Sequence, residues 1–255
     1  MTTKEEAKIK KRFWEIDFWR GIAVICMIIY HLAYNLTYFG PFNLTLYRGP
    51  WLYFQRLTAS SFLFLVGLSL SITYDRDLKK ETSFLFHKYL KRGLKIFSYG
   101  LLITLVTWLF MGELYVRFGI LHCIGVSIIL AYPFLAKRSI NWIPGVIFII
   151  TGWILHYMEF PFSYLLWLGL KPHQFYTIDY FPLLPWFGIV LIGTTVGKLL
   201  YPSYKRAFSI PDYSHLFLIK GINFLGQHSL LIYLIHQPII LLILFLLGWV
   251  ELTTF

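Results

Sequence analysis

RFWEIDFWRGIAVICMIIYHLAYNLTY, residues 12–38, is an apolar stretch that carries Asp17, Arg20, His31 and Asn35. A helix turns by 100° per residue, so spacings of 3, 11 and 4 residues place these side chains within one stripe. The rise from Arg20 to His31 is roughly 16 Å, so we expect Arg20 at one membrane surface and His31 in the opposite half of the bilayer. An ionisable residue held in lipid is costly and predicts a functional site. The alternative is a histidine bonded to a neighbouring helix for packing alone.

Similar apolar runs recur along the chain, whose mean hydropathy is +0.65. A helix needs about 20 apolar residues to cross the hydrocarbon core. Runs of this kind lie at 18–39, 52–74, 94–111, 118–136, 141–158, 181–201 and 222–248. We therefore predict an all-α, polytopic integral membrane protein with about seven transmembrane helices, forming one transmembrane domain over residues 1–255. No cleavable signal peptide is expected, because the first run is full length and lacks a small-residue cleavage site.

The net charge of +11 has an uneven distribution along the chain. If the N-terminus is inside and the chain crosses seven times, the inner segments hold 19 Lys and Arg against eight acids, and the outer segments hold four of each. This asymmetry follows the positive-inside rule and predicts an inner N-terminus and an outer C-terminus. A nucleic-acid partner is not needed to explain the charge.

The two cysteines, Cys26 and Cys123, both fall within apolar runs. Neither has the spacing of a metal ligand, so we expect no disulfide and no metal site.

Unusual polar residues gather in an outer layer of the predicted topology. His31 and Asn35 come from the first run, and Arg117 and His122 from FGILHCIG. Asp179 and Trp186 lie in DYFPLLPWFG, whose two prolines favour a rigid, non-helical start to the sixth run. His236 lies near the middle of the last run, where the following proline is expected to bend the helix.

A second group of polar residues lies in the inner layer, around the run HKYLKRGLKIF. Its members include Asp17, Arg20, His87, Lys88, Lys91, Arg92, Lys95, Gln227 and His228. Two interpretations stay open. The basic run is either an anchor for anionic lipids or a cradle for a phosphorylated cytosolic ligand, because Lys and Arg clusters hold phosphates well.

These blocks carry a resemblance to a known family. EIDFWRGIAVICMIIYH resembles the opening helix of the transmembrane acyltransferase superfamily, and especially prokaryotic relatives of heparan-alpha-glucosaminide N-acetyltransferase. FGILHCIG, DYFPLLPWFG and GQHSLLIYLIHQP are similar to further blocks of those relatives. The interval from Arg20 to His31 and the basic run are also similar to motifs of the acyltransferase-3 family.

The resemblance implies an acetyl-CoA-dependent enzyme of a multi-pass prokaryotic cytoplasmic membrane. Whether the chain forms a homo-oligomer stays open. Such an enzyme delivers an acyl group from cytosolic acyl-CoA to an extracytoplasmic sugar or glycan. The lysosomal relative has Asn at the position of His31 and a catalytic His in the next outer loop, whereas the loop 40–50 here contains no His. This departure leaves N- and O-acylation open.

The chemistry of acyl transfer assigns roles to the two layers. A base must take the acceptor's proton, and donors must face the developing oxyanion. His31 would be the base or a transient acyl carrier, with Asp179, His122 and Asn35 as further catalytic candidates. The donor would bind at Arg20, Lys91, Arg92, Lys95 and His228, and the acceptor at Arg117, Trp186 and His236.

Two other functions fit parts of the sequence. Buried His and Asp residues occur in proton-coupled small-molecule transporters, although paired inverted halves are not evident. A haem-binding electron carrier would use His31, His122 and His236 as axial ligands.

Overall fold

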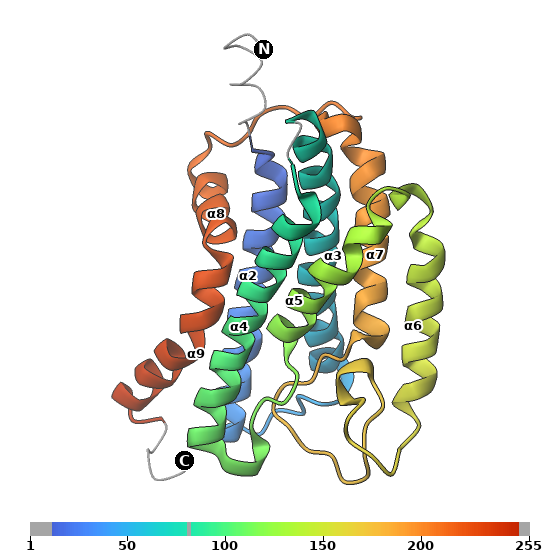
Figure 1. The fold of residues 1–255 in the computed structure, drawn as a ribbon. Helices are drawn as coiled ribbons and strands as arrows, with labels where there is room; N and C mark the ends of the chain where they lie inside the picture. The colour runs from blue at the N-terminus through green and yellow to red at the C-terminus, as the bar shows by residue number, and fades with distance from the viewer. Residues whose placement is uncertain (1–11, 81–82, 250–255) are drawn as a thin grey trace. The chain divides into compact units, whose positions relative to one another are not determined.

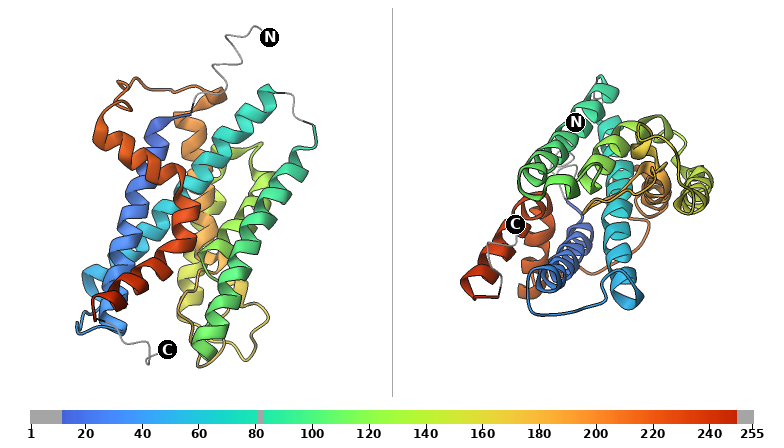
Figure 2. Two further views of the ribbon diagram at one scale, coloured as in Figure 1. Left: turned by 90° about the vertical axis from the view of Figure 1, so that its left-hand side faces the viewer. Right: turned by 90° about the horizontal axis from the view of Figure 1, so that it is seen from below.

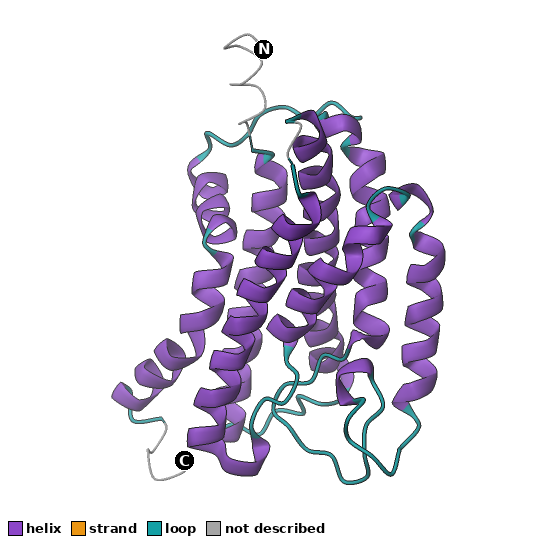
Figure 3. Ribbon diagram, viewed as in Figure 1, coloured by secondary structure: helices purple, strands orange, loops and turns teal. Residues whose placement is uncertain are grey.

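Helices make up the regular structure of the computed structural model, which describes residues 12–80 and 83–249 (Figures 1 and 3). Within these ranges there are no strands beyond two isolated bridges, so the all-α prediction is confirmed. The α-helices are α2 (Trp14–Tyr38), α3 (Gly49–Lys79), α4 (Leu85–Met111), α5 (Ile120–Ala131), α6 (Trp142–His156), α7 (Leu183–Leu200), α8 (Phe217–Gln227) and α9 (Ser229–Leu246). Short 3-10 helices are η1 (Gly112–Leu114), η2 (Tyr132–Phe134), η3 (Arg138–Ile140), η4 (Leu166–Leu168) and η5 (Pro202–Tyr204).

The predicted apolar runs correspond to these helices with two differences. Among the described residues, 5 helices are long and apolar enough to span a membrane, whereas Ile120–Phe134 and Trp142–His156 are apolar but shorter. The last run is divided at His228 between α8 and α9. Seven crossings and the orientation of the termini stay predictions, and residues 1–11 and 250–255, whose charges entered that argument, lie outside the described ranges.

Proline shapes two helices as the sequence indicates. Pro182 has extended backbone before α7, and Leu184 within its first turn is non-helical with a ψ of 120°. Pro238 lies inside α9, where it removes a backbone N–H and crowds the preceding turn. Figure 2 shows the second half of α9 bent away from the first.

The described chain contains two compact units. The central unit comprises residues 63–209, and the terminal unit comprises residues 12–62 and 210–249. Helix α3 contributes to both, because its residues up to Phe62 belong to the terminal unit.

Glycines bring the helices of the central unit into close contact. A Cβ atom built on Gly67 of α3 would lie 1.9 Å from the carbonyl oxygen of Val190 in α7. One on Gly93 of α4 would lie 2.6 Å from the carbonyl oxygen of Gly125 in α5. Small residues at such crossings are how membrane helices gain packing contact without a hydrophobic driving force between them.

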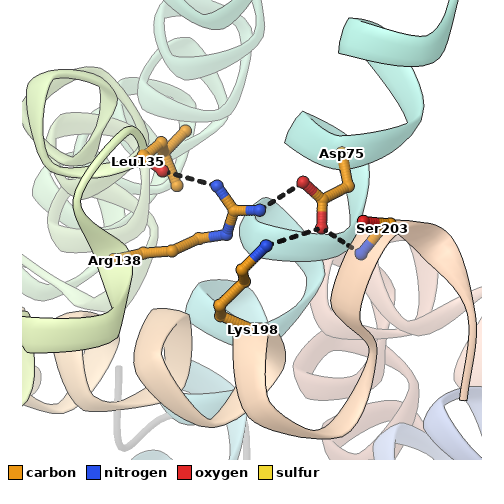
Figure 4. Close-up of polar contacts among 5 residues, drawn as sticks. All are labelled: Asp75, Leu135, Arg138, Lys198 and Ser203. Atoms are coloured by element: carbon orange, nitrogen blue, oxygen red, sulfur yellow. Dashed lines mark hydrogen bonds and ion pairs between the residues drawn. The ribbon is translucent and has the colours of Figure 1, made fainter. Parts of the chain in front are cut away.

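A buried ion cluster joins α3, α7, η3 and η5 in the central unit (Figure 4). Asp75 and Arg138 are 6% and 4% exposed, and the Arg138 guanidinium donates to the Asp75 carboxylate and to the Leu135 carbonyl oxygen. The second Asp75 oxygen lies 3.9 Å from Lys198 Nζ and accepts the Ser203 N–H at 2.8 Å. Because buried charges need partners, this cluster fixes the helix ends that it joins.

In the terminal unit, α8 and α9 pack against α2 (Figures 1 and 2). The α2–α8 contact is glycine-mediated. A Cβ on Gly226 would lie 1.8 Å from the carbonyl oxygen of Asp17, and one on Gly21 would lie 2.1 Å from that of Ile222. This crossing accepts no side chain at either glycine, so it sets how α8 lies on α2.

Candidate functional site

Two imidazoles meet between α2 and α9 in the terminal unit. The ring centroids of His31 and His236 are 4.7 Å apart at an interplanar angle of 62°. His236 Nδ1 lies 2.7 Å from the Tyr233 carbonyl oxygen, so Nδ1 carries the proton and Nε2 is the bare nitrogen. His236 Nε2 and His31 Nδ1 are both buried without a hydrogen-bond partner among the described residues. Each imidazole therefore has a nitrogen available to a ligand.

An amide pair lies beside the two imidazoles. Asn35 Nδ2 donates to Gln237 Oε1 at 3.2 Å, and Gln237 Nε2 donates to Asn35 Oδ1 at 3.0 Å. Asn35 is 0% exposed. We call His31, Asn35, His236 and Gln237 the imidazole cluster. Sequence reasoning missed Gln237, although an uncharged amide within an apolar helix, next to a predicted site histidine, was a usable signal.

The first turns of α2 hold a second polar group of the terminal unit. Arg20 donates to Asp17 Oδ1 at 2.9 Å, one turn away on the same helix. The other carboxylate oxygen of Asp17 and the side-chain oxygen of Asn223 in α8 are buried without a hydrogen-bond partner in the described chain. His228 is exposed at the junction of α8 and α9, with Nδ1 2.8 Å from the Phe224 carbonyl oxygen.

In the central unit, Asp179 and His122 both bind the N-terminus of α5. Asp179 Oδ2 accepts the Ile120 N–H at 3.2 Å, and His122 Nδ1 accepts the Gly119 N–H at 3.2 Å. The proton of the imidazole is therefore on Nε2, which faces Thr104 Oγ1 at 3.5 Å. Both nitrogens of His122 are engaged, unlike those of the imidazole cluster.

Aromatic rings enclose His122, which is 2% exposed. Phe118 stacks on the imidazole with centroids 5.4 Å apart, and Phe97 meets it edge-on at 5.1 Å. Gly100 of α4 makes room for the ring, because a Cβ there would lie 2.9 Å from His122 Nδ1. These contacts suit a residue that holds α5 in place.

Backbone pairing brings Asp179 to α5. The Ile178 N–H donates to the Leu114 carbonyl at 3.1 Å, and the Phe181 N–H donates to the Phe118 carbonyl at 2.9 Å. These bonds align two segments that are distant in sequence. Burial raises the pKa of Asp179 to about 7, although the Ile120 N–H opposes the shift.

Arg117 lies beside this pairing with its guanidinium over two rings. Its Cζ is 5.1 Å from the Tyr115 ring centroid and 5.6 Å from that of Phe175. Glu113, which is 97% exposed at its side chain, is 3.7 Å away. Trp186 in the first turns of α7 packs on Phe181 with centroids 4.8 Å apart.

The basic run lies on the first turns of α4 in the central unit. Lys88 Nζ is 2.6 Å from Asp77 Oδ1, and Asp77 is buried. Lys91, Arg92 and Lys95 are exposed. Lys88 is thus exposed but held in an ion pair with Asp77, and Lys91, Arg92 and Lys95 are the donor-binding candidates.

The predicted site residues therefore fall into separate groups. His31, Asn35, His236, Arg20 and His228 belong to the terminal unit, and Asp179, His122, Arg117, Trp186, Lys91, Arg92 and Lys95 to the central unit. Within residues 12–80 and 83–249, no group of three or more His, Cys, Asp or Glu side chains could hold a metal ion.

Comparison with known proteins supports one family. The family model described as heparan-alpha-glucosaminide N-acetyltransferase, catalytic, matches residues 12–238. Searches of curated proteins and of solved structures found no significant match. The matched range contains every residue of the imidazole cluster.

Proposed function

Since the chain belongs to the heparan-alpha-glucosaminide N-acetyltransferase catalytic family, we propose that it transfers an acyl group from cytosolic acyl-CoA across the membrane. The donor is acetyl-CoA, and the acceptor is an extracytoplasmic sugar or glycan. The observation that carries this proposal is the meeting of His31 and His236 on two apolar helices. Each imidazole has a buried nitrogen with no hydrogen-bond partner in the described chain. We place the enzyme in a prokaryotic cytoplasmic membrane.

His31 acts as the general base. It takes the proton of the acceptor's O–H or N–H, whose oxygen or nitrogen forms the new bond to the acyl carbon. The carbon–sulfur bond of the thioester breaks, and the released thiolate of coenzyme A takes up a proton. His236 faces the base and binds the acceptor. A transient acyl group on His31 is the alternative route to the same products.

The donor binds at the inner face, where Lys91, Arg92 and Lys95 are exposed on α4. Clustered cations suit the phosphates of coenzyme A. Replacing Lys91 and Arg92 by Gln is expected to weaken acetyl-CoA binding about tenfold or more and to reduce its salt dependence. Isothermal titration at two salt concentrations measures both quantities. Unchanged affinity would reduce the run to a lipid anchor.

The acceptor binds at the outer side, where we place Asp179, Arg117 and Trp186 around it. The exposed part of the Arg117 guanidinium and the half-buried Trp186 ring supply the polar and aromatic contacts typical of a small-molecule site. Asp179→Asn is expected to impair transfer and leave acetyl-CoA binding intact. If this substitution abolished donor binding instead, the two sides would be reversed.

Topology has its own test. Single cysteines at Thr45 and Ile210, introduced with Cys26 and Cys123 replaced by Ala, are labelled in intact cells with an impermeant thiol reagent. Position 45 should react from outside and position 210 only after the membrane is opened. The reverse pattern contradicts the inner N-terminus.

Thermal stabilisation separates the transferase from the other functions. Purified protein should be stabilised by acetyl-CoA and not by ATP, because binding to the folded state raises the unfolding temperature. A transporter of another solute would not be stabilised by acetyl-CoA. A haem protein would show a visible absorption spectrum.

A further inference from the structure

We propose that Gln237 is a positioning residue. Its amide pair with Asn35 holds α9 against α2 in the register at which the imidazoles of His31 and His236 meet. The role rests on the proposed function, because it matters only if His31 reacts. Asn35 then acts through His31 rather than on the substrate.

The geometry of the pair carries this inference. Each helix supplies one imidazole and one amide: His31 lies one turn before Asn35 on α2, and His236 directly precedes Gln237 on α9. The two amides exchange hydrogen bonds of 3.2 and 3.0 Å between positions 202 residues apart in sequence. A flip of one amide alone would bring nitrogen against nitrogen and oxygen against oxygen, so the orientations of the two amides are coupled.

Burial and pairing favour an indirect role for Asn35. Its side chain is 0% exposed, and Gln237 takes its oxygen and one of its two N–H groups. A contact of this oxygen or of this N–H with the acyl group would require the pair to open. The same burial makes the bonds geometrically demanding, because an amide left unpaired in an apolar setting has no water to bind.

A side-chain contact that fixes the register of α9 against α2 is useful next to Pro238. Pro238 follows Gln237 within α9 and removes a backbone hydrogen bond of this helix. A slip of one residue moves a helix by roughly 1.5 Å, and a misplacement of about 1 Å at a reacting group can cost about 10²-fold in rate. The amide pair is the side-chain contact adjacent to both imidazoles that opposes this slip.

Exchange of the two amides distinguishes positioning from direct contact. Gln237→Leu removes both bonds and is expected to lower kcat by about 10- to 10²-fold, while KM for acetyl-CoA stays within about twofold. The double variant Asn35→Gln/Gln237→Asn keeps the summed length of the pair and is expected to restore kcat. If Asn35 touches the substrate, the double variant would regain stability but not kcat, because the amide at position 35 would be displaced.

The assay follows transfer from radiolabelled acetyl-CoA to D-glucosamine as the probe acceptor, with rates normalised to folded protein. Thr37→Val is the matched control, because Thr37 also lies on α2 but bonds only locally, to the Ala33 carbonyl at 2.9 Å. It should leave kcat unchanged. A Gln237→Leu enzyme with normal kcat per folded molecule would make the pair a packing contact and overturn the proposal.

A second readout does not depend on activity. Cysteines replacing His31 and His236, with Cys26 and Cys123 changed to Ala, are joined by a short bifunctional thiol reagent. We expect rapid cross-linking with Gln237 present and at least about tenfold slower cross-linking with Gln237→Leu. A short reagent can join the two thiols only when α9 keeps its register against α2. Equal rates would contradict the proposal. Rapid, Gln237-dependent cross-linking in a protein that neither transfers acetyl groups nor is stabilised by acetyl-CoA would instead refute the proposed function.

Discussion

Replacing Asp179 by Asn should stabilise the protein above neutral pH while it impairs transfer. Burial raises the pKa of Asp179 to about 7, so the folded state favours the protonated acid. The stability contributed by this proton is fully present below the unfolded pKa of about 3.9 and is lost as pH rises through about 7. A difference of about three pKa units corresponds to about 4 kcal/mol at most. An amide at position 179 carries no such loss, and its oxygen can still accept the Ile120 N–H.

Thermal unfolding of the purified protein between about pH 5 and about pH 8 measures this effect. The unfolding temperature of Asp179→Asn should exceed that of the unmodified protein only slightly at the acid end. The difference should grow up to about pH 7 and then level off. Glu113→Gln is the matched control, because that carboxylate is 97% exposed and should leave the pH dependence unchanged. Parallel curves for Asp179→Asn and the unmodified protein would refute the burial argument.

Two further predictions concern packing and charge within the units, both measured by thermal unfolding. Gly226→Ala places a methyl group 1.8 Å from the Asp17 carbonyl oxygen and should lower the free energy of unfolding by about 1–3 kcal/mol or more. Gly221→Ala is the control, because a Cβ there has nothing within 4 Å, and it should be neutral or slightly stabilising. Equal effects of the two substitutions would contradict the α2–α8 contact. Asp75→Ala leaves the buried Arg138 guanidinium without its carboxylate and should lower the free energy of unfolding by about 3–5 kcal/mol. Arg138→Met should cost less, because Asp75 keeps Lys198 and the Ser203 N–H as partners. The reverse order would contradict the cluster in Figure 4.

Hydropathy predicted the helical class and the place of each apolar run, because run length is set directly by bilayer thickness. It did not predict the break at His228, since a window of about 20 residues averages the polar segment GQHS with the apolar residues on either side. It also overstated the lengths of α5 and α6, because the apolar residues after α5 form the 3-10 helix η2 and α6 ends at His156. Composition alone does not record where backbone hydrogen bonding stops.

The candidate site was predictable where one helix carries the signal. The spacing of His31 and Asn35 on α2 needs no tertiary information, and both residues do belong to one cluster. The partners Gln237 and Asp75 were missed because their bonds join positions 202 and 63 residues apart. A single sequence contains no direct record of such pairings.

The most direct test of the central claim is the rate of acetyl transfer by His31→Ala, measured with radiolabelled acetyl-CoA and D-glucosamine. Loss of a general base is expected to lower turnover by about 10²- to 10⁴-fold, while thermal stabilisation by acetyl-CoA is retained. His122→Ala should retain more activity per folded molecule, because both nitrogens of that imidazole bond within the protein. Near-normal turnover in His31→Ala, with loss in His122→Ala, would contradict the account and move the chemistry to α5.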